Sequence, residues 1–209
     1  CAGCQGRYLD GGVAMSVQTF VVNLAIEYPP GTYPSIRNDV VGSVQVTQGI
    51  AGSGLLDRVA STGTVKFRLR NVNNVYTPHH INCVGGFAFG APVWLTIGGP
   101  TNYYWFKGLI SQIDPINAGD LSSFVDVTVV DYIDTLARHE LQLPAFAQNK
   151  KMEEIVALII ANMPVAPDGV SYGTGQDTFA TVFDTTRSTT RALTEIAKVT
   201  QSELGLTWI

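Results

Sequence analysis

The sequence predicts an α+β fold that is mainly β, in which an antiparallel β-domain precedes a helical region. Up to about residue 130, apolar and polar residues alternate in several short segments, most of them joined by short turns. This period-two pattern is typical of an antiparallel sheet that closes into a barrel or packs as a sandwich. After residue 131, apolar residues recur every three to four positions, which is the spacing of amphipathic helices.

The predicted strands are rich in Val, Ile and aromatic residues, which favour an extended backbone. Pro29, Pro30 and Gly31 end the first strand region, which covers one long or two short strands. Gly42 and Gly108 lie inside strand patterns and predict bulges or bends. The expected strand ranges are 13–28, 39–47, 64–70, 92–99, 103–115 and 124–130, with a long loop at 71–92.

The stretch VKFRLRNVNNVYTP, residues 65–78, contains a strand that runs into an asparagine-rich corner. Its apolar residues alternate with Lys and Arg and are predicted to face the core of the β-domain. Asparagine tolerates a left-handed backbone, so we expect a positive φ at Asn73 or Asn74. We expect Tyr76 to be buried over the end of the barrel and Pro78 to fix the exit into the loop.

Two helices are predicted directly after the last strand. Asp131 fits the N-cap of the first helix, with Asp134 at the third helical position, where a carboxylate suits the positive end of the helix. This helix is expected to be short and to end before Pro144. Residues 151–163 predict a second helix with an apolar stripe, which Pro164 stops.

A third helix is predicted to begin at Ser188 or Thr189 and to end at Gly205. The last residues, 206–209, resemble the start of a further strand, and the first residue is Cys rather than Met. Both ends are therefore interpreted as those of a processed chain or of a fragment of a longer product. The expected division is an N-terminal segment 1–12, a β-barrel 13–137, and a helical region 138–209 that ends in the start of a second β-domain.

The composition favours a protein that works in an assembly. Hydrophobic residues make up 45% of the 209 residues and charged residues only 14%, and a surface poor in charge is often covered by partners. The net charge of −4 disfavours coating of DNA or RNA through basic patches. No window reaches the run of about 18 apolar residues that a membrane helix needs, so we expect no stable membrane insertion.

The cysteines and two histidines raise the question of a metal site. Cys1 and Cys4 form a lone CxxC motif, and Cys83 follows His79 and His80. These residue types are metal ligands, but neither cluster has the paired spacing of a zinc motif. The favoured interpretation is a thiol pair near the N-terminus and a buried thiol beside loop histidines, with no metal and no cofactor.

No arrangement of residues predicts catalysis. Asp126, Asp131 and Asp134 are close in sequence, but Asp126 is expected to face away from the apolar side of its strand and the other two to serve a helix start. No GxSxG motif lies on a predicted strand-to-helix turn, the position that a nucleophile elbow requires. A hydrolase that uses Asp126 or Asp131 with His79 or His80 is kept as a third hypothesis, and the prediction is that the chain is not an enzyme.

The aromatic run at residues 103–106 has two interpretations. Consecutive strand residues alternate between the faces of a sheet, so we expect two of the four rings in the core and two at an interface. Alternatively, Trp94, Tyr103, Tyr104 and Trp105 form a stacking surface for a carbohydrate or another cell-surface ligand. This second interpretation predicts a carbohydrate- or cell-surface-binding β-domain.

The order of several motifs along the chain resembles the tail-hub or minor tail proteins of tailed phages. These are similar to the baseplate hub of contractile tails and to the hub of type VI secretion spikes. The resemblance covers residues 33–140 and 187–209. The motifs are an Asp-Val-x-x-x-Val strand, Arg58-x-Ala60-x-x-Gly63, VKFRLRNVNNVYTP, Gly90-x-Pro92-Val93, YWFKGLISQIDP, VTVVDYIDTLAR and RSTTRALTEIAKVTQSELGLTWI.

The resemblance implies a tail-tube-like β-barrel at 13–137, with the helical insertion and the start of a second barrel at 138–209. It further implies a homotrimer whose barrels form a ring in the virion, joining the tail tube to the tip around a channel for the tape measure protein and DNA. The implied partners are tail tube, distal tail and tail-fibre proteins, and no catalysis belongs to this part. The loop at 71–92 matches the family pattern only at its Pro and Gly positions.

Overall fold

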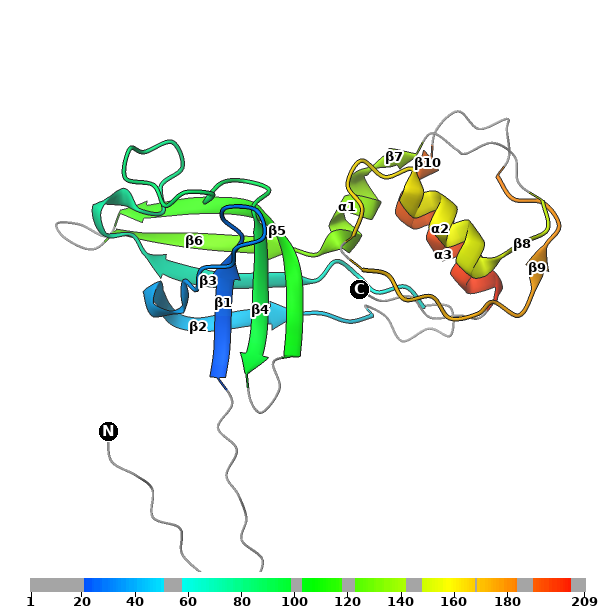
Figure 1. Cartoon of the computed structure of the whole chain (residues 1–209), viewed down its shortest axis with the longest axis horizontal. Helices are drawn as coiled ribbons and strands as arrows, with labels where there is room; N and C mark the ends of the chain where they lie inside the picture. The colour runs from blue at the N-terminus through cyan, green and yellow to red at the C-terminus, as the bar shows by residue number, and fades with distance from the viewer. Residues whose placement is uncertain are drawn as a thin grey trace, which may run out of the picture.

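Six antiparallel strands form one curled sheet in the order β1-β4-β5-β6-β3-β2 (Figure 1). The computed structural model describes residues 21–50, 58–98, 103–117, 123–141, 148–167, 169–183 and 190–203. The strands are β1 (Val21–Ile26), β2 (Val40–Thr47), β3 (Thr64–Arg70), β4 (Pro92–Gly98), β5 (Tyr103–Asn117) and β6 (Ser123–Val130). The sheet is a half-barrel, and this confirms the predicted fold class, mainly β with helices after the sheet.

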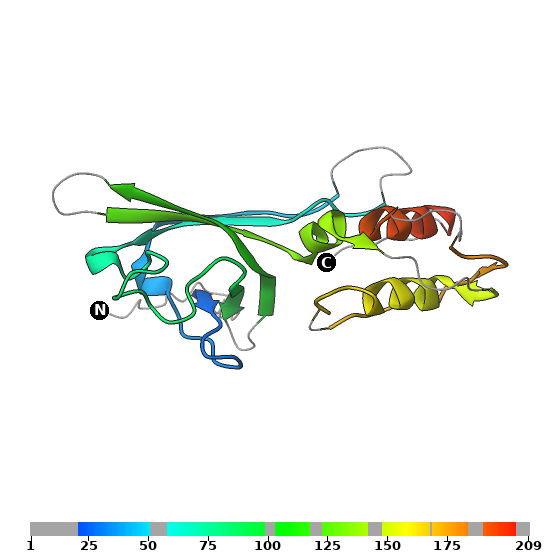
Figure 2. The same cartoon turned by 90° about the horizontal axis from the view of Figure 1, so that it is seen from above.

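Alternate residues of the strands build the core of this β lobe. The side chains at Val65, Phe67 and Leu69 are buried, whereas Lys66 and Arg68 between them are exposed. The same alternation holds on β6. In Figure 2, the segments that connect the strands lie mainly on one side of the sheet, and they add Ile36, Tyr76, Phe87 and Ala91 to the buried cluster.

The asparagine-rich corner has the predicted conformation. Asn73 and Asn74 both have positive φ, of 57° and 61°, and both lie within a short 3-10 turn, η2 (Val72–Asn74). Tyr76 is only 3% exposed. Its backbone N–H donates to Asn71 Oδ1 at 2.7 Å and its hydroxyl donates to Asp39 Oδ2 at 2.5 Å. The corner therefore ties the loop to η1 (Arg37–Asp39), a second 3-10 turn before β2.

Two glycines in the strands behave differently. Gly42 has a φ of +81°, and the register between β2 and β3 shifts between Val41 and Gln45, which confirms a bulge. Gly108 itself pairs regularly with Val93, and the register of β5 with β6 shifts nearby instead, between Ile110 and Gln112. Glycine is needed at 108 for another reason, because a Cβ there would lie 2.2 Å from the carbonyl oxygen of Val130 on the neighbouring strand.

The helical lobe follows β6 and has a core of its own. It contains α1 (Tyr132–Arg138), α2 (Met152–Ala161) and α3 (Ala192–Ser202). Two short antiparallel pairs flank them: β7 (Glu140–Leu141) with β10 (Thr190–Arg191), and β8 (Lys150–Lys151) with β9 (Thr178–Phe179). Buried residues from the three helices and from the segments between them form this second cluster, which is separate from the sheet core. No helix in the described part of the chain is long and apolar enough to cross a membrane.

The third helix begins later than its sequence suggests. Its N-cap is Arg191 rather than Ser188 or Thr189, because the two residues before the helix pair with β7 and stay extended. The helix ends at Ser202, with Glu203 as its C-cap. Gly205, the predicted end, and the expected strand start at 206–209 lie outside the described residues, as do residues 1–20.

A buried carboxylate joins the two lobes. Asp131 follows β6, is 4% exposed, and caps α1 by accepting a hydrogen bond from the Ile133 N–H at 3.1 Å. Its other oxygen accepts from the Gly63 N–H at 2.7 Å, and its own N–H donates to the Gly63 carbonyl at 3.1 Å. The helix cap and the entry into β3 therefore share one side chain, which confirms the predicted N-cap.

Candidate functional site

Asp126 and Asp131 have structural partners. Asp126 accepts two hydrogen bonds from the Arg68 guanidinium, at 2.6 and 2.8 Å, across the exposed face of β3 and β6. This partner lowers the pKa of the Asp126 carboxyl. Burial raises the pKa of Asp131, and the hydrogen bonds from Gly63 and Ile133 oppose that rise. Neither carboxylate contacts a histidine among the described residues.

Within the described residues, His79, His80 and Cys83 do not come together as a group that could hold a metal ion. The His80 N–H donates to the Thr77 carbonyl, and its Nδ1 accepts from the Asn82 N–H at 3.2 Å, so this histidine stabilises its own turn. Burial raises the pKa of the Cys83 thiol, which disfavours the thiolate that binds metals. Over the described ranges, no group of three His, Cys, Asp or Glu side chains could hold a metal ion. Cys1 and Cys4 lie outside those ranges.

The aromatic run at the start of β5 is more exposed than predicted. Tyr103, Tyr104 and Trp105 are 62%, 68% and 48% exposed, whereas Phe106 is 3% exposed. One ring, not two, therefore enters the core. The pairing of β4 with β5 shifts between Leu95 and Thr96, and this bulge interrupts the simple alternation of faces. We call Tyr103, Tyr104 and Trp105 the aromatic end of the sheet.

The aromatic end continues into a cluster around Trp94 on β4. The Trp94 ring lies 4.2 Å from the Tyr33 ring and 4.8 Å from the Tyr104 ring, between ring centroids. Lys107 Nζ lies 3.9 Å from the centroid of the Trp94 ring, a cation–π distance. Trp94 Nε1 is buried and finds no hydrogen-bond acceptor among the described residues. The cluster packs four polar-tipped side chains on the outer face of the sheet.

The two edges of the sheet differ. The edge of β1 is covered by residues 34–36, because the Ile26 N–H donates to the Pro34 carbonyl and the Ile36 N–H donates to the Leu24 carbonyl. At the other edge, β2 pairs with β3 alone within the described part of the chain. Its valines at 40, 44 and 46 are only partly buried against the core. Among the described strands, the long β2 strand is therefore an open edge of the sheet, and such an edge presents unpaired backbone groups.

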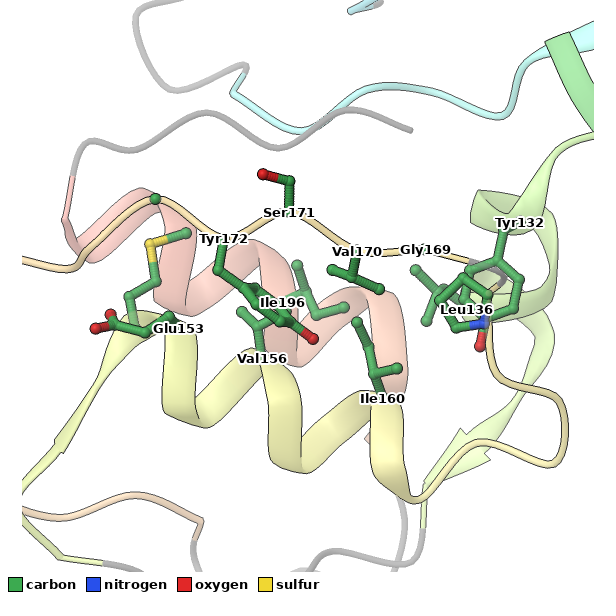
Figure 3. Close-up of a pocket in the computed structure, with 13 residues that line it drawn as sticks. Tyr132, Leu136, Glu153, Val156, Ile160, Gly169, Val170, Ser171, Tyr172 and Ile196 are labelled. Atoms are coloured by element: carbon green, nitrogen blue, oxygen red, sulfur yellow. The ribbon is translucent and has the colours of Figure 1, made fainter. Parts of the chain in front are cut away.

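The helical lobe contains a cavity of about 480 Å³, which we call the strap pocket. One face of α2 forms its floor together with Ile196 of α3 and two residues of α1. The strap, which we define as residues 165–167 and 169–175, crosses over it (Figure 3). Val170 and Tyr172 point from the strap towards the helices, and Ser171 points away. The lining residues are Tyr132, Leu136, Met152, Glu153, Val156, Ile160, Pro167, Gly169, Val170, Ser171, Tyr172, Gly173 and Ile196.

A smaller, polar cavity of about 340 Å³ adjoins the strap pocket and shares Met152 and Gly173 with it. Asp177 and Glu203 line this cavity, and Glu153 lies at its edge, where its Oε2 accepts from the Gly175 N–H at 2.7 Å. Glu203 Oε1 is buried and has no hydrogen-bond partner among the described residues. We call Glu153, Asp177 and Glu203 the acidic rim.

The apolar pattern of α2 predicts one stripe, but the same pattern also contains a signal for the strap pocket. Ile155 and Ile159 are fully buried against the rest of the helical core. Met152, Val156 and Ile160, each four residues apart, border the same core and also line the pocket. The apolar stripe of α2 is wider than packing against one neighbouring helix requires. This width is the only sequence feature that distinguishes the second face.

Comparison with solved structures identifies the fold. The chain superposes on a 43 kDa tail protein of prophage MuSo2 from Shewanella oneidensis with a TM-score of 0.55 and 11% identity, covering 91% of this chain and 51% of that one. This chain has the fold of a phage tail protein. It spans about half the length of the MuSo2 protein. Neither a protein-family model nor a curated protein matches the sequence.

Two further structures superpose less closely. A tail protein from Neisseria meningitidis MC58 has a TM-score of 0.44 and 10% identity, covering 69% of this chain and 34% of that chain. An E. coli component of the type VI secretion system, described as similar to T4 bacteriophage tail proteins, has a TM-score of 0.43 and 8% identity, covering 90% of this chain and 40% of that chain. The fold assignment depends on the MuSo2 protein.

Proposed function

We propose that this chain is a structural component of a phage tail tip or baseplate hub, in which it helps form a ring that joins the tail tube to the tip. The observation that carries the proposal is the match to a phage tail protein fold over 91% of the chain. The described site residues agree with a structural role, because the acids that sequence reasoning considered for catalysis are paired with Arg68 or with backbone amides.

The open edge of β2 gives the ring a contact between subunits. A strand edge with unpaired backbone groups pairs readily with a strand of another chain. Closing this edge against a neighbouring copy would also bury the half-covered valines of β2. Three copies in the virion, contacts to tail tube, distal tail and tail-fibre proteins, and a channel for the tape measure protein and DNA complete the proposal. The net charge of −4 suits a channel that does not grip DNA.

Light scattering and electron microscopy of the purified chain test this function. We expect a ring-like oligomer at high protein concentration, and a monodisperse monomer would count against the proposal. A double variant, Ser43→Lys with Gln45→Lys, places charges on the exposed positions of β2 and should dissociate the oligomer, because edge lysines block strand pairing. Gln112→Lys, which adds one lysine at an exposed position of the inner strand β5, is the control and should leave the oligomer intact, as Gln45→Lys alone should not.

The aromatic end of the sheet supports a second candidate function, binding of a carbohydrate or cell-surface ligand. Tyr103, Tyr104 and Trp105 are exposed next to one another, and exposed rings stack on planar apolar surfaces of ligands. A glycan array would reveal binding that Trp105→Ala abolishes. If the same variant instead weakens the oligomer and no glycan binds, the rings belong to a subunit contact.

A further inference from the structure

The helical lobe leaves apolar surface unfilled beneath the strap. Protein cores are close-packed, with few voids larger than a water molecule. The strap pocket measures about 480 Å³ and has Val156, Ile160 and Ile196 along its floor. This volume lies within the range of roughly 300 to 1,000 Å³ that ligand sites occupy. A cavity of this size and lining has room for an apolar side chain of another molecule.

The strap is held at its two ends and is free between them. At one end, the Tyr132 hydroxyl donates to the Val165 carbonyl at 2.5 Å. At the other end, the Gly175 N–H donates to Glu153 Oε2 at 2.7 Å. Around Gly169 and Gly173, no described heavy atom lies within 4 Å of the place that a Cβ would take. The middle of the strap can therefore shift to fit an occupant without breaking either anchor.

The backbone of the strap favours a peptide as the occupant. None of the described residues forms a backbone hydrogen bond with residues 169–174, and this segment is extended rather than helical. Unpaired amides and carbonyls along an extended segment are the groups that a second extended chain pairs with. The exposed side chains of Val170 and Tyr172 flank that backbone and would give a second chain apolar neighbours.

The acidic rim specifies the charge of the occupant. Glu153, Asp177 and Glu203 border the two adjoining cavities, and no described Lys or Arg lines either of them. The buried Glu203 Oε1 has no partner among the described residues. A buried carboxylate oxygen without a donor costs free energy that a cationic side chain would recover.

We propose that the strap pocket receives an extended segment of a partner protein, which inserts one large apolar side chain beneath the strap and sets a neighbouring Lys or Arg against the acidic rim. This site lies in the helical lobe, away from the open edge of β2, and it does not depend on the ring. In this proposal, the helical lobe is the binding site for a segment of a second protein chain.

The test is a titration of the full chain with the peptide acetyl-Gly-Phe-Lys-Gly-Gly-amide, followed by NMR of the Met, Val and Ile methyl groups. We expect shifts at Met152, Val156 and Ile160. The same peptide with Glu in place of Lys should bind roughly tenfold more weakly, because its charge repels the acidic rim. A peptide with Ala in place of Phe should bind no better than the Glu peptide.

Two variants with matched controls locate the site. Val156→Phe fills the cavity from its floor and should abolish the shifts, whereas Ala161→Phe, at an exposed position of the same helix outside the pocket, should preserve them. Glu203→Gln keeps the size of the side chain. It should weaken binding of the Lys peptide but not binding of the Glu peptide. Glu140→Gln, exposed on β7, is its control. Intact methyl spectra of the free variants exclude misfolding as the cause.

Four results would overturn the proposal. Equal binding of the Lys and Glu peptides would remove the role of the acidic rim, and the absence of shifts at the highest soluble peptide concentration would remove the site. Binding of octylammonium without binding of any peptide would identify a small cationic ligand instead. Binding that begins only after deletion of residues 204–209 would identify the chain's own last residues as the occupant.

Discussion

The two lobes of this chain bury apolar residues in different ways. In the β lobe, strands from both ends of the sheet and the loops between them close around one core, and most of its large side chains are fully buried. In the helical lobe, three short helices share a smaller core and leave the strap pocket beside it. From this difference in packing we expect the β lobe to be the more rigid part of the molecule and the helical lobe the more adaptable part.

The largest effect is expected in the core of the β lobe. Leu69 is completely buried in β3, so Leu69→Ala removes packing and leaves a cavity. We expect the free energy of unfolding to fall by about 3 kcal/mol, measured by chemical denaturation. The control is Val72→Ala, three residues later and 53% exposed, which should change little. A small effect of Leu69→Ala would mean that the sheet core is not the main source of stability.

A matched change in the helical lobe should be smaller and local. Ile159 is completely buried in α2, and Ile159→Ala should cost about 2 kcal/mol, because its neighbours can relax into the adjoining pocket. We expect hydrogen exchange to accelerate in α2 and α3 while β3 and β6 stay protected. Accelerated exchange in both lobes would show that they unfold as one cooperative unit and would break the comparison.

The junction between the lobes is the next target. Asp131→Ala removes the helix cap and the acceptor for the Gly63 N–H, and we expect a loss of about 1 to 2 kcal/mol. The amides of Gly63 and Ile133 should then exchange faster with solvent. Asp134→Ala, also in the first turn of α1 but paired with Arg138 at the surface, is the matched control and should have a smaller effect. Equal losses of stability in the two variants would mean that the hydrogen bond from Asp131 to Gly63 adds nothing beyond the effect of any acidic residue in the first turn of a helix.

The smallest effect is expected on the outer face of the sheet. Arg68 lowers the pKa of the Asp126 carboxyl below its ordinary value of 3.8. Because the pKa is lowered in the folded state, the stabilisation is present above pH 3.8 and is lost as the pH falls through the lowered value. Arg68→Gln should return the pKa of Asp126 towards 3.8 in a carbon-detected NMR titration. The stability difference between the two chains should be greater at neutral pH than below 3.8, and a constant difference would contradict this account.

Local patterns in the sequence predicted the scaffold well. Alternation places Val65, Phe67 and Leu69 in the core, and asparagine chemistry gives the positive φ values at Asn73 and Asn74. These features depend on a few neighbouring residues, which the sequence displays directly. The expected division at 1–12, 13–137 and 138–209 stays a prediction, and so does the second β-domain.

Features that depend on distant residues were harder to predict. The aromatic end of the sheet follows from a bulge set by the register with β4, and the start of α3 follows from pairing with β7. Gly108 is required by the backbone of Val130, a neighbour across the sheet. The strap pocket arises because the side chains of the strap, α1, α2 and α3 do not fill the space between these four segments. No local pattern in one segment records such an arrangement.

The double link between Asp131 and Gly63 also has a mechanical consequence. If the backbone between β6 and α1 were the only connection, it alone would carry any tension applied to the helical lobe. Because β6 is tied at its end to the start of β3, tension on the helical lobe along the strand direction would be shared by two antiparallel strands. The hydrogen bonds between β3 and β6 would then be loaded in shear. Many of them would resist the force at the same time, and they would not open one after another. The joint is therefore suited to transmit force between the lobes while each keeps its shape.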